Sequence, residues 1–253
     1  MTMSINKKNK KGENMITEGH HYFNNETDFW TLNENRVFLE LVKSENNILD
    51  IGCGKGTFLK KLADKGISCD GIDFSKTMID AARKNYEGYN INLYHGNFIT
   101  YDFKKKYDCI ISNAVLEHVE DDSAFIRKIE MLLNPNGKLI LLTSAHPWLY
   151  SVFDESVHHY RRYGKKQLHE LVKKNKFIIV STRYWDVLGI PYLLYARLFK
   201  RMLLSQNKFN NKHFNSLLDL WFRVVENNIR PPFGLNIIIV ARKVEETKDG
   251  ARK

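Results

Sequence analysis

Short apolar runs alternate along the middle of the chain with stretches in which apolar residues recur every three or four positions. The short runs predict buried β-strands, and the periodic stretches predict amphipathic α-helices. Strands that alternate with helices form a parallel sheet with helices on both faces. We therefore predict a three-layer, doubly wound α/β fold with strands at 48–51, 68–72, 91–94, 107–112, 137–143, 177–184 and 235–241, and helices at 57–65, 76–84, 122–133 and 165–175.

The two ends of the chain lack this periodicity. Residues 1–18 are polar and lysine-rich, and residues 245–253 are again polar and charged, which is typical of segments outside a core. We expect a disordered basic leader at 1–18, a helical lid at 19–46, a main domain at 47–244 and a tail at 245–253. No apolar stretch follows the basic leader, so neither a secretory signal nor a membrane anchor is predicted.

A segment of unusual length separates the last two predicted strands. Residues 186–230 are too many for a simple connection, and long insertions in compact domains are usually functional. The pattern predicts helices, the first starting at Pro191 and carrying Arg197, Lys200 and Arg201 along one edge. A later helix has one apolar face that consists of Phe214, Leu217, Leu218, Trp221, Phe222 and Val225. Three roles are open: covering a site, lying in a membrane interface, or packing on the chain's own domain.

Charge and cysteine content narrow the classes of partner and compartment. The 253 residues carry 39 Lys and Arg against 29 Asp and Glu, a net charge of +10. This excess favours anionic partners without choosing between phosphates, nucleic acid and membrane surface. Cys53, Cys69 and Cys109 are odd in number and lack a metal-ligand spacing, so we expect no metal site, no disulfide framework and a cytoplasmic location.

Three glycines, Gly52, Gly54 and Gly56, directly follow the first predicted strand. Glycine lets the backbone approach a ligand closely, and the helix after such a loop directs free N–H groups toward it. Asp73 ends the second strand, where the Rossmann rule places a ribose-binding carboxylate. Asp50, just before the loop, is placed to meet a ligand ammonium. The pattern thus predicts a ribose-containing cofactor at this strand end.

A nicotinamide dinucleotide is the alternative ligand for such a loop. Its fingerprint, G-x-G-x-x-G, requires a third glycine at the position that Thr57 occupies, and the chain has G-x-G-x-G instead. This difference disfavours the dinucleotide interpretation.

The middle of the chain resembles, in order, the motifs of class I, Rossmann-like S-adenosylmethionine-dependent methyltransferases, especially their small-molecule branch. The four segments are ILDIGCGKGTFLKKLADKG, GIDFSKTMIDAARKN, YDCIISNAVLEHVED and LNPNGKLILLTSA. The resemblance spans roughly residues 47–145. It implies a sheet of about seven strands with the last one antiparallel, and S-adenosylmethionine bound over the carboxyl ends of the strands.

By position, this resemblance also implies a set of cofactor contacts. Asp50, Gly52, Cys53 and Gly54 would hold the methionine part, Asp73 the ribose, Phe74 the adenine face, Asn97 and Phe98 the adenine edge, and Asn113 and Leu116 the sulfonium side and the adenosine pocket. Many family members carry Asp at the position of Asn97, so here an amide oxygen would accept from the adenine amino group. For Leu116, core packing is an equal alternative.

The loop that leaves the fifth strand carries the candidates for acceptor binding, because loops on this side of such folds carry specificity. The candidates are Trp148, Tyr160, Arg161, Arg162 and Tyr163, with Tyr22 added from the predicted lid. The loop resembles the P-A-x-x-W-L-x-S…D…H-x-R-R-Y segment of methyltransferases considered to act on glycans or lipid-linked sugars. The two arginines would clamp an anion, or one of them would form a structural ion pair.

Three histidines are candidates for a general base: His118, His146 and His159. Methyl transfer from a sulfonium is an in-line displacement in which the protein mainly supplies alignment and desolvation. A hydroxyl acceptor must also lose its proton, a role suited to histidine, whereas a phosphate or carboxylate needs no base. A structural role for His118 is the alternative.

The acceptor class follows from what the fourth strand lacks. Residues 112–115, Ser-Asn-Ala-Val, differ from the Asn/Asp-Pro-Pro-aromatic tetrapeptide of methyltransferases that act on base amino groups. We therefore expect transfer to oxygen of a small-molecule, glycan or lipid-linked acceptor, with peripheral membrane contact as an accompanying hypothesis. An RNA methyltransferase is the first alternative, and a non-catalytic cofactor-binding partner subunit is the second.

Overall fold

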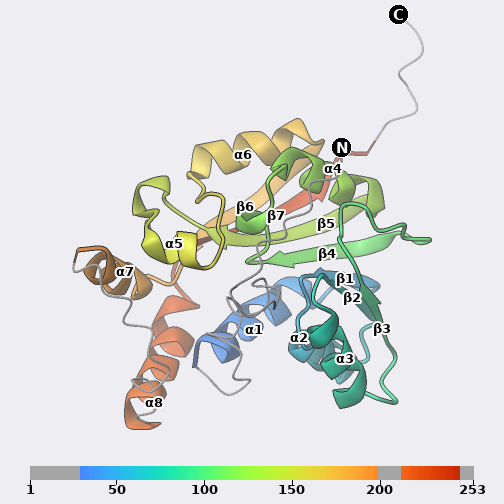
Figure 1. Cartoon of the computed structure of the whole chain (residues 1–253), viewed down its shortest axis with the longest axis horizontal. Coiled ribbons are helices and arrows are strands. Elements are labelled where there is room, and N and C mark those ends of the chain that lie inside the picture. Colours follow the sequence, from blue (N-terminus) through green and yellow to red (C-terminus); the bar gives the residue numbers. More distant parts are fainter. Residues whose placement is uncertain (1–28, 199–211, 246–253) are drawn as a thin grey trace, which may run out of the picture.

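The computed structural model describes residues 29–198 and 212–245 (Figure 1). Its centre is a seven-stranded sheet with strand order β3-β2-β1-β4-β5-β7-β6. The strands are β1 (Ile48–Ile51), β2 (Cys69–Asp73), β3 (Ile91–His95), β4 (Tyr107–Asn113), β5 (Leu133–Ser144), β6 (Phe177–Trp185) and β7 (Asn236–Lys243). Strand β7 is antiparallel to β5 and β6, while the other pairs are parallel. The predicted doubly wound fold is confirmed.

Helices cover both faces of this sheet, as Figure 1 shows. One face carries α1 (Phe29–Val42), α2 (Thr57–Ala63) and α3 (Lys76–Asn85), and the other carries α4 (Asp122–Leu132) and α6 (Lys165–Lys174). A short helix, α5 (Val152–Ser156), which the sequence pattern did not predict, lies in the connection from β5 to α6. The three layers agree with the expected architecture.

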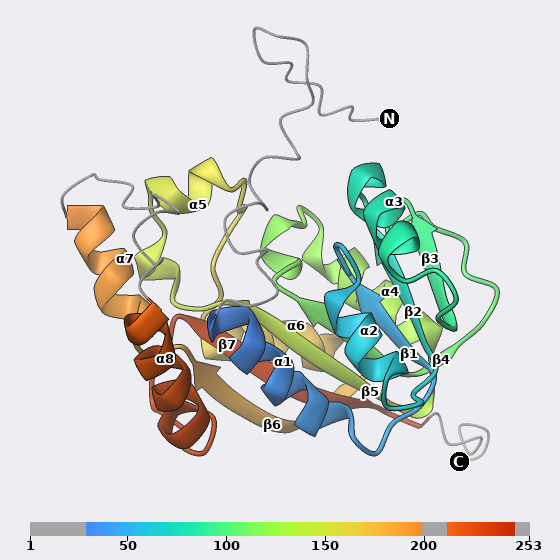
Figure 2. The same cartoon turned by 90° about the horizontal axis from the view of Figure 1, so that it is seen from below.

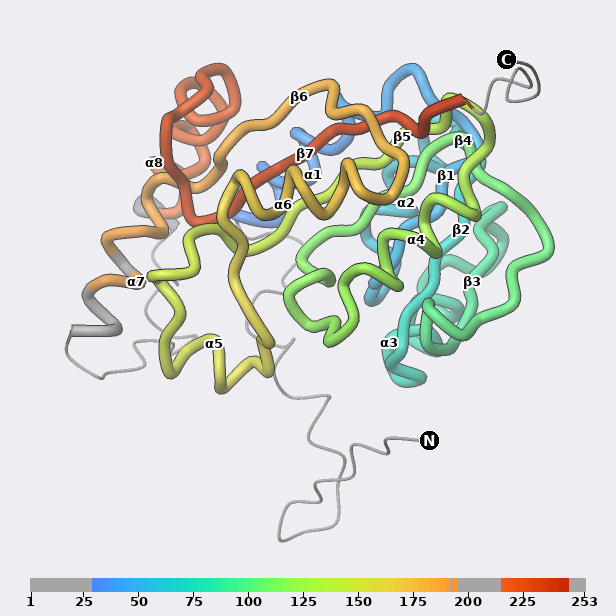
Figure 3. Tube along the Cα trace, turned by 90° about the horizontal axis from the view of Figure 1, so that it is seen from above, coloured from blue at the N-terminus to red at the C-terminus, as the bar shows by residue number. Residues whose placement is uncertain are grey.

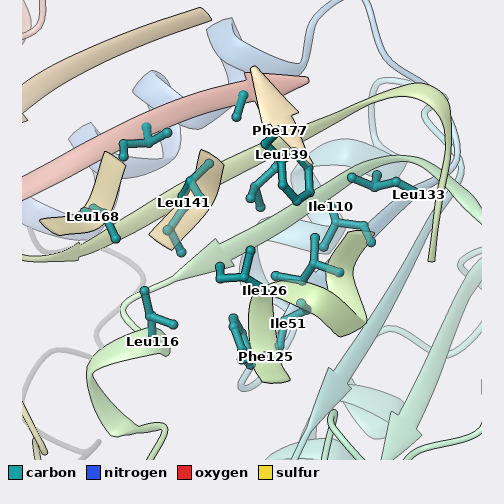
Figure 4. Close-up of a cluster of buried hydrophobic side chains, with 14 of the residues drawn as sticks. Ile51, Ile110, Leu116, Phe125, Ile126, Leu133, Leu139, Leu141, Leu168 and Phe177 are labelled. Atoms are coloured by element: carbon teal, nitrogen blue, oxygen red, sulfur yellow. The ribbon is translucent and has the colours of Figure 1, made fainter. Parts of the chain in front are cut away.

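The central strands are apolar because they are buried on both faces, as parallel sheets are. Leu49 and Ile51 in β1 contact the core under α4 and α6, while Ile48 contacts the core under α1 and α2. Phe125, Ile126 and other apolar residues of α4 close the first core (Figure 4). This packing leaves the edges of the sheet, and not its faces, available for ligands.

Helix α1 is an integral part of the second core. Val37, Phe38 and Val42 are buried there together with Ile48 and Leu59. The described part of the predicted lid at 19–46 is therefore a fixed layer of the domain. Residues 19–28, with Tyr22, and the predicted leader lie outside the described residues, so their lid function stays a prediction.

All strands except β7 end at one edge of the sheet, which we call the site edge. Because β7 is antiparallel to both its neighbours, β6 runs in the same direction as β5. The chain turns at this edge through residues with positive φ: Ala114 (51°) after β4, His146 (61°) after β5 and Asp186 (64°) after β6. Such backbone conformations are uncommon for residues other than glycine and gather at functional sites.

The insertion between β6 and β7 is helical, as predicted. It contains α7 (Gly189–Leu198), α8 (Lys212–Trp221) and a π-helical turn, η6 (Phe222–Glu226). Helix α8 lies beside α1 in Figures 2 and 3. The carboxylate of Asp219 is 2.6 Å from the Arg36 guanidinium and accepts a 2.9 Å hydrogen bond from Asn33 Nδ2. The insertion thus packs on its own domain at α1.

The apolar face predicted for the second inserted helix is only half correct. Phe222 is buried between the rings of Phe29, Trp30 and Trp185. Leu217 and Trp221, by contrast, are 65% and 38% exposed. The reason is that α1 presents polar side chains at the contact, so that Asp219 turns toward α1.

Gly71 in β2 lets the glycine loop at residues 52–56 and helix α2 pack closely against this strand, because a side chain at Gly71 would collide with both. A Cβ at Gly71 would lie 2.4 Å from Leu59 Cδ1 and 2.7 Å from Cys53 Sγ. We expect Gly71→Ala to lower the free energy of unfolding by about 1–3 kcal/mol through overpacking, measured by urea denaturation. In the control Gly164→Ala, the nearest atom is Pro147 Cδ at 3.9 Å, and the loss should stay below 1 kcal/mol as an order of magnitude. Equal losses would contradict this account.

Candidate active site

The glycine loop at residues 52–56 is fixed to the end of β2 by backbone hydrogen bonds. The amides of Gly52 and Cys53 donate to the carbonyl oxygen of Ile72 over 2.8 and 3.2 Å. Gly54 has φ 54°, and a Cβ there would meet no heavy atom within 4 Å in the described part of the chain. The backbone at Gly54 therefore borders open space at the site edge, where a ligand can approach it closely.

The carboxylate of Asp73 joins the glycine loop to the turn after β2. Its Oδ2 accepts from Gly54 N and its Oδ1 accepts from Ser75 N, each over 2.8 Å. An ionised carboxylate has about four lone-pair sites, so both oxygens can accept further hydrogen bonds. Asp73 is thus held rigidly with acceptor capacity left for two ribose hydroxyls.

Asp50 is a buried acid at the end of β1, only 5% exposed. Burial, together with the negative charges of Asp73 and Glu34, raises its pKa to about 8. Near neutral pH its carboxyl group is therefore mostly protonated in this structure. A cationic ligand beside Asp50 would stabilise the ionised carboxylate, so the affinity for such a ligand would be higher when Asp50 has lost its proton. The neighbouring Cys53 thiol is neutral, because burial raises its pKa well above the usual value.

Strand β4 contributes a buried acceptor to the same region. The Oδ1 atom of Asn113 is buried and has no hydrogen-bond partner among the described residues. A buried polar atom without a partner is costly and is usually explained by a ligand or a water molecule. The cationic methionine part of S-adenosylmethionine fits this region, which offers the unpaired Asn113 oxygen, the acids Asp50 and Asp73, and open space beside Gly54.

The predicted adenine contacts fall into two groups. The ring of Phe74 is 58% exposed, so it is free to stack, and Asn97 Oδ1 accepts from Ile99 N over 2.9 Å. Phe98 and Leu116 are buried, and Phe98 packs against the ring of Phe125 (Figure 4 shows Leu116 and Phe125). The side chains of Phe98 and Leu116 therefore pack in the hydrophobic core, which is the alternative weighed for Leu116.

A buried acid that sequence analysis did not select ties three segments together. Glu117, in η3 (Leu116–His118), accepts from Thr143 Oγ1 over 2.8 Å and from Ser144 Oγ over 2.9 Å. Its backbone oxygen accepts from Tyr160 N over 2.8 Å. The connection from β5 to α6 at residues 145–164, which we call the acceptor loop, is thereby fixed to the ends of β4 and β5. In the sequence, Glu117 could have been recognised as a candidate because it is a single acid within the mainly apolar run 114–119.

Asp154 holds the acceptor loop together through contacts with His159 and Arg162. It is fully buried, its Oδ1 lies 2.8 Å from His159 Nδ1, and the same oxygen lies 2.7 Å from Arg162 Nε. Burial raises the pKa of Asp154, but the His159 hydrogen bond and the positive charge of Arg162 outweigh it and keep the pKa below its usual range. The carboxylate is therefore ionised and orients the His159 ring.

Two of the three predicted histidines are brought together. The rings of His118 and His159 have centroids 4.6 Å apart and are nearly perpendicular at 80°. When Asp154 holds the proton on His159 Nδ1, Nε2 carries the lone pair, which is the arrangement of a carboxylate-oriented base. His159 and His118 thus form an imidazole pair next to the end of β4.

His146 lies apart from this pair. Its ring stacks on Tyr184 with centroids 5.0 Å apart and an angle of 11°. Burial lowers its pKa, and the charge of Arg162 lowers it further. Its Nε2 is buried without a hydrogen-bond partner in the described part of the chain. His146 is therefore a neutral imidazole that helps to shape the end of β5.

The remaining acceptor candidates are also divided. The side chains of Trp148 and Tyr160 are 57% and 42% exposed. Arg161 donates to Asp122 Oδ2 over 2.9 Å and to Glu120 O over 2.7 Å. Tyr163 is fully buried, and its hydroxyl donates to Asp122 as well.

These contacts change the picture of the arginine clamp. Arg162, 3% exposed, is committed to Asp154, and Tyr163 is committed to Asp122. We therefore assign Arg162 and Tyr163 to the packing of the loop and not to an acceptor. Trp148 and Tyr160 stay candidates, and Arg161 is the more exposed arginine. Tyr22 lies outside the described residues.

Residues 29–198 and 212–245 contain neither a metal-binding cluster nor a membrane-spanning helix. Within these ranges, no three His, Cys, Asp or Glu side chains are grouped so that they could hold a metal ion. In the same ranges, no helix has both the length and the apolar character needed to cross a membrane.

Sequence relatives of this chain include several O-methyltransferases. The chain is 26% identical over 175 residues to the ubiquinone biosynthesis O-methyltransferase of Bartonella tribocorum, which covers 62% of this chain and 69% of the relative. It is 26% identical over 155 residues to malonyl-[acyl-carrier protein] O-methyltransferase 1 of Ilyobacter polytropus, which covers 57% of this chain and 58% of the relative. The chain thus spans 69% and 58% of the length of these two relatives.

Solved structures share the fold at low sequence identity. Phosphoethanolamine N-methyltransferase 2 of Haemonchus contortus, in complex with S-adenosyl-L-methionine, superposes with a TM-score of 0.60 at 20% identity, covering 85% of this chain and 53% of that chain. An S-adenosylmethionine-dependent methyltransferase of Mesorhizobium loti gives a TM-score of 0.58 at 17% identity, covering 82% of this chain and 96% of that one.

A family profile decides the classification. The profile described as "Methyltransferase domain" matches residues 24–215, which is most of the chain. It includes the glycine loop, Asp50, Asp73 and the acceptor loop. The chain therefore belongs to the methyltransferase domain family of S-adenosylmethionine-dependent enzymes.

Proposed function

We propose that this chain transfers a methyl group from S-adenosylmethionine, held at the site edge, to an oxygen atom of a small-molecule, glycan or lipid-linked acceptor. The observation that carries the proposal is the pair formed by the Asp154-oriented imidazole of His159 and the ring of His118, next to the end of β4. A hydroxyl acceptor requires such a base, whereas a more acidic acceptor does not. The O-methyltransferase names of the relatives in Bartonella and Ilyobacter support the choice of oxygen.

The cofactor would be held by the residues of the glycine loop and the adjoining strand ends. Asp73 would accept from the ribose hydroxyls, Asp50 and Asn113 would face the methionine part beside the open backbone of Gly54, and Phe74 would stack on adenine. When bound, S-adenosylmethionine supplies an electrophilic methyl group on a positively charged sulfur. The acidic surroundings favour this cation over its neutral product.

The acceptor would bind on the opposite side of the methyl group, over η3 and the acceptor loop. Trp148 and Tyr160 offer exposed aromatic faces that can pack on a sugar or another ring. His159 Nε2 would take the hydroxyl proton while the oxygen attacks the methyl carbon and the carbon–sulfur bond breaks. The H-x-R-R-Y pattern then has two roles, since His159 is the base and Arg162 stabilises the carboxylate that orients it.

An RNA acceptor is disfavoured by the state of the two arginines. Arg161 is bound to Asp122 and Glu120, and Arg162 is bound to Asp154. Neither guanidinium is free to clamp a phosphate without breaking these contacts. A non-catalytic partner subunit is the second alternative, and turnover of labelled cofactor distinguishes it from an enzyme.

The role of Asp73 can be tested by cofactor binding. We expect Asp73→Ala to weaken S-adenosylmethionine binding at least about tenfold, because charge-assisted hydrogen bonds to the ribose are lost along with the anchor of Gly54. Isothermal titration calorimetry measures this directly. The control Asp102→Ala removes an exposed acid that pairs with Lys104 and should leave the affinity unchanged. Absence of binding by the unmutated protein would refute the proposal.

The raised pKa of Asp50 predicts a pH dependence of cofactor binding. The free protein holds a proton on Asp50 up to about pH 8, and a bound cation stabilises the carboxylate, so binding at pH 7 should release up to one proton. The affinity should therefore rise by up to about tenfold per pH unit from pH 6 toward pH 8. Titrations in buffers of different ionisation enthalpy count the released protons. An Asp50→Asn protein should release correspondingly fewer, and equal release by both proteins would contradict the assignment.

The base is tested by a methyl-labelling assay with tritiated S-adenosylmethionine and phenolic, glycan, polyprenyl-linked and RNA acceptors. We expect His159→Gln to lower kcat about 10²–10⁴-fold with an unchanged KM for the cofactor. His169→Gln, which changes a histidine bound to Thr182, is the control and should retain full activity.

The chemical stability of the labelled product identifies the acceptor group. Methylation of a hydroxyl gives an ether that resists alkali, which is the expected result. Label released as methanol in alkali would mark a carboxylate acceptor and remove the need for a base. Label in RNA would favour the first alternative.

A further inference from the structure

The outer face of the second inserted helix is apolar. Leu217, Leu220, Trp221 and Val224, which we call the α8 stripe, have spacing i, i+3, i+4 and i+7 along α8 and η6 and so lie on one side of the helix. Their exposed fractions are 65%, 46%, 38% and 58%. A helix that packs on its own domain normally presents polar residues to solvent. The α8 stripe reverses this pattern.

The α8 stripe is exposed although the helix is firmly attached to its domain. Asp219 is bound to Arg36 and Asn33, and Phe222 is 1% exposed between α1 and β6. Glu226 Oε1 accepts from Asp186 N over 2.9 Å. These contacts from three successive turns fix the rotation of the helix, so the α8 stripe is held outward by the fold itself.

The charges of the insertion point to an anionic partner. Residues 186–230 contain seven Lys and Arg against three acids. Asp186 and Glu226 are buried, and Asp219 is paired with Arg36, so every acid of the insertion faces the domain. Arg223 and Arg230 are exposed beside the α8 stripe. An apolar face with exposed arginines and no exposed acid is the pattern of helices that lie in a membrane interface.

The stripe also has neighbours of the same kind at the site edge. Leu188, Ile229 and Phe233, at the two ends of the insertion, are 39%, 45% and 50% exposed. The insertion leaves β6 at the site edge, and α7 lies beside α5 of the acceptor loop in Figures 1 and 2. A surface that binds the insertion would therefore lie close to the acceptor loop.

We propose that the α8 stripe, with Arg223 and Arg230, docks this protein on the surface of an anionic lipid bilayer. The apolar side chains enter the acyl boundary, Trp221 takes the interfacial position that tryptophan prefers, and the arginines meet the headgroup phosphates. A second copy of this chain is a poorer occupant, because two chains of net charge +10 repel each other. Docking on the bilayer does not depend on the proposed function. The further consequence, that a lipid-linked acceptor reaches the site from the bilayer, rests on the proposed function.

The test is co-sedimentation of the full chain with two kinds of vesicle, without cofactor or acceptor. One kind is pure phosphatidylcholine, and the other contains in addition about one third phosphatidylglycerol, an amount that gives a strongly negative surface. We expect binding to the anionic vesicles, weakened by added salt as screening predicts. The variant L217E/V224E should bind them at least about tenfold more weakly.

A matched control separates the α8 stripe from general surface hydrophobicity and charge. The variant I178E/V180E changes two side chains that are 61% and 59% exposed on β6 and adds the same charge, so its vesicle binding should exceed that of L217E/V224E. Cofactor titration of all three proteins shows that the fold is intact, because none of these side chains belongs to the cofactor site.

Three outcomes would overturn the proposal. They are failure of the parent protein to bind either vesicle, equal loss of binding in both double variants, and a concentration-dependent dimer in light scattering that L217E/V224E abolishes while vesicles bind nothing. Failure of methyl transfer, in contrast, would leave the vesicle result unaffected, so the two proposals fail separately.

Discussion

The burial of parallel strands on both faces is the constraint on which the rest of the structure depends. Parallel strands need helical crossovers, and the helices occupy both faces of the sheet, so ligands are confined to its edges. Because β7 alone runs in the direction opposite to the other six strands, the segments that follow β1, β2, β4, β5 and β6 all begin at one edge. The glycine loop, η3, the acceptor loop and the insertion converge there for this reason.

Three of the buried acids at this edge, Asp50, Glu117 and Asp154, are accommodated in different ways. Asp50 keeps a proton, since burial and the nearby acids raise its pKa to about 8. Glu117 is satisfied by the hydroxyls of Thr143 and Ser144. Asp154 is ionised because Arg162 and His159 compensate its burial. Of these three acids, Asp50 alone has no compensating partner among residues 29–198 and 212–245, so it is the one best placed to respond to a cation that binds and leaves.

Sequence analysis was most successful where a local spacing carries the information. The strand-loop-helix pattern with Gly52, Gly54 and Asp73 predicted the fold and the contact between the glycine loop and the end of β2, because the residues involved lie within about twenty positions of each other, as in other Rossmann-like folds. Arg162 could not be placed in this way. Its ion pair with Asp154 joins two positions of the acceptor loop that no strand or helix periodicity relates. The bond of Tyr163 to Asp122 joins residues 41 positions apart in the chain and depends on how this loop packs against the start of α4. Whether an arginine faces a ligand or an acid of its own chain is a tertiary property.

The same limit explains the outer face of α8. From periodicity alone, the apolar residues of a helix are expected to face its domain, yet here an acid, Asp219, faces inward. Asn33 on α1 and the amide of Asp186 at the end of β6 are buried and need partners, and a buried polar group without one costs more than an exposed leucine. Satisfying them sets the rotation of α8 and exposes Leu217 and Val224. The exposure of these two side chains is thus a consequence of the contacts that α8 and η6 make with α1 and with the end of β6.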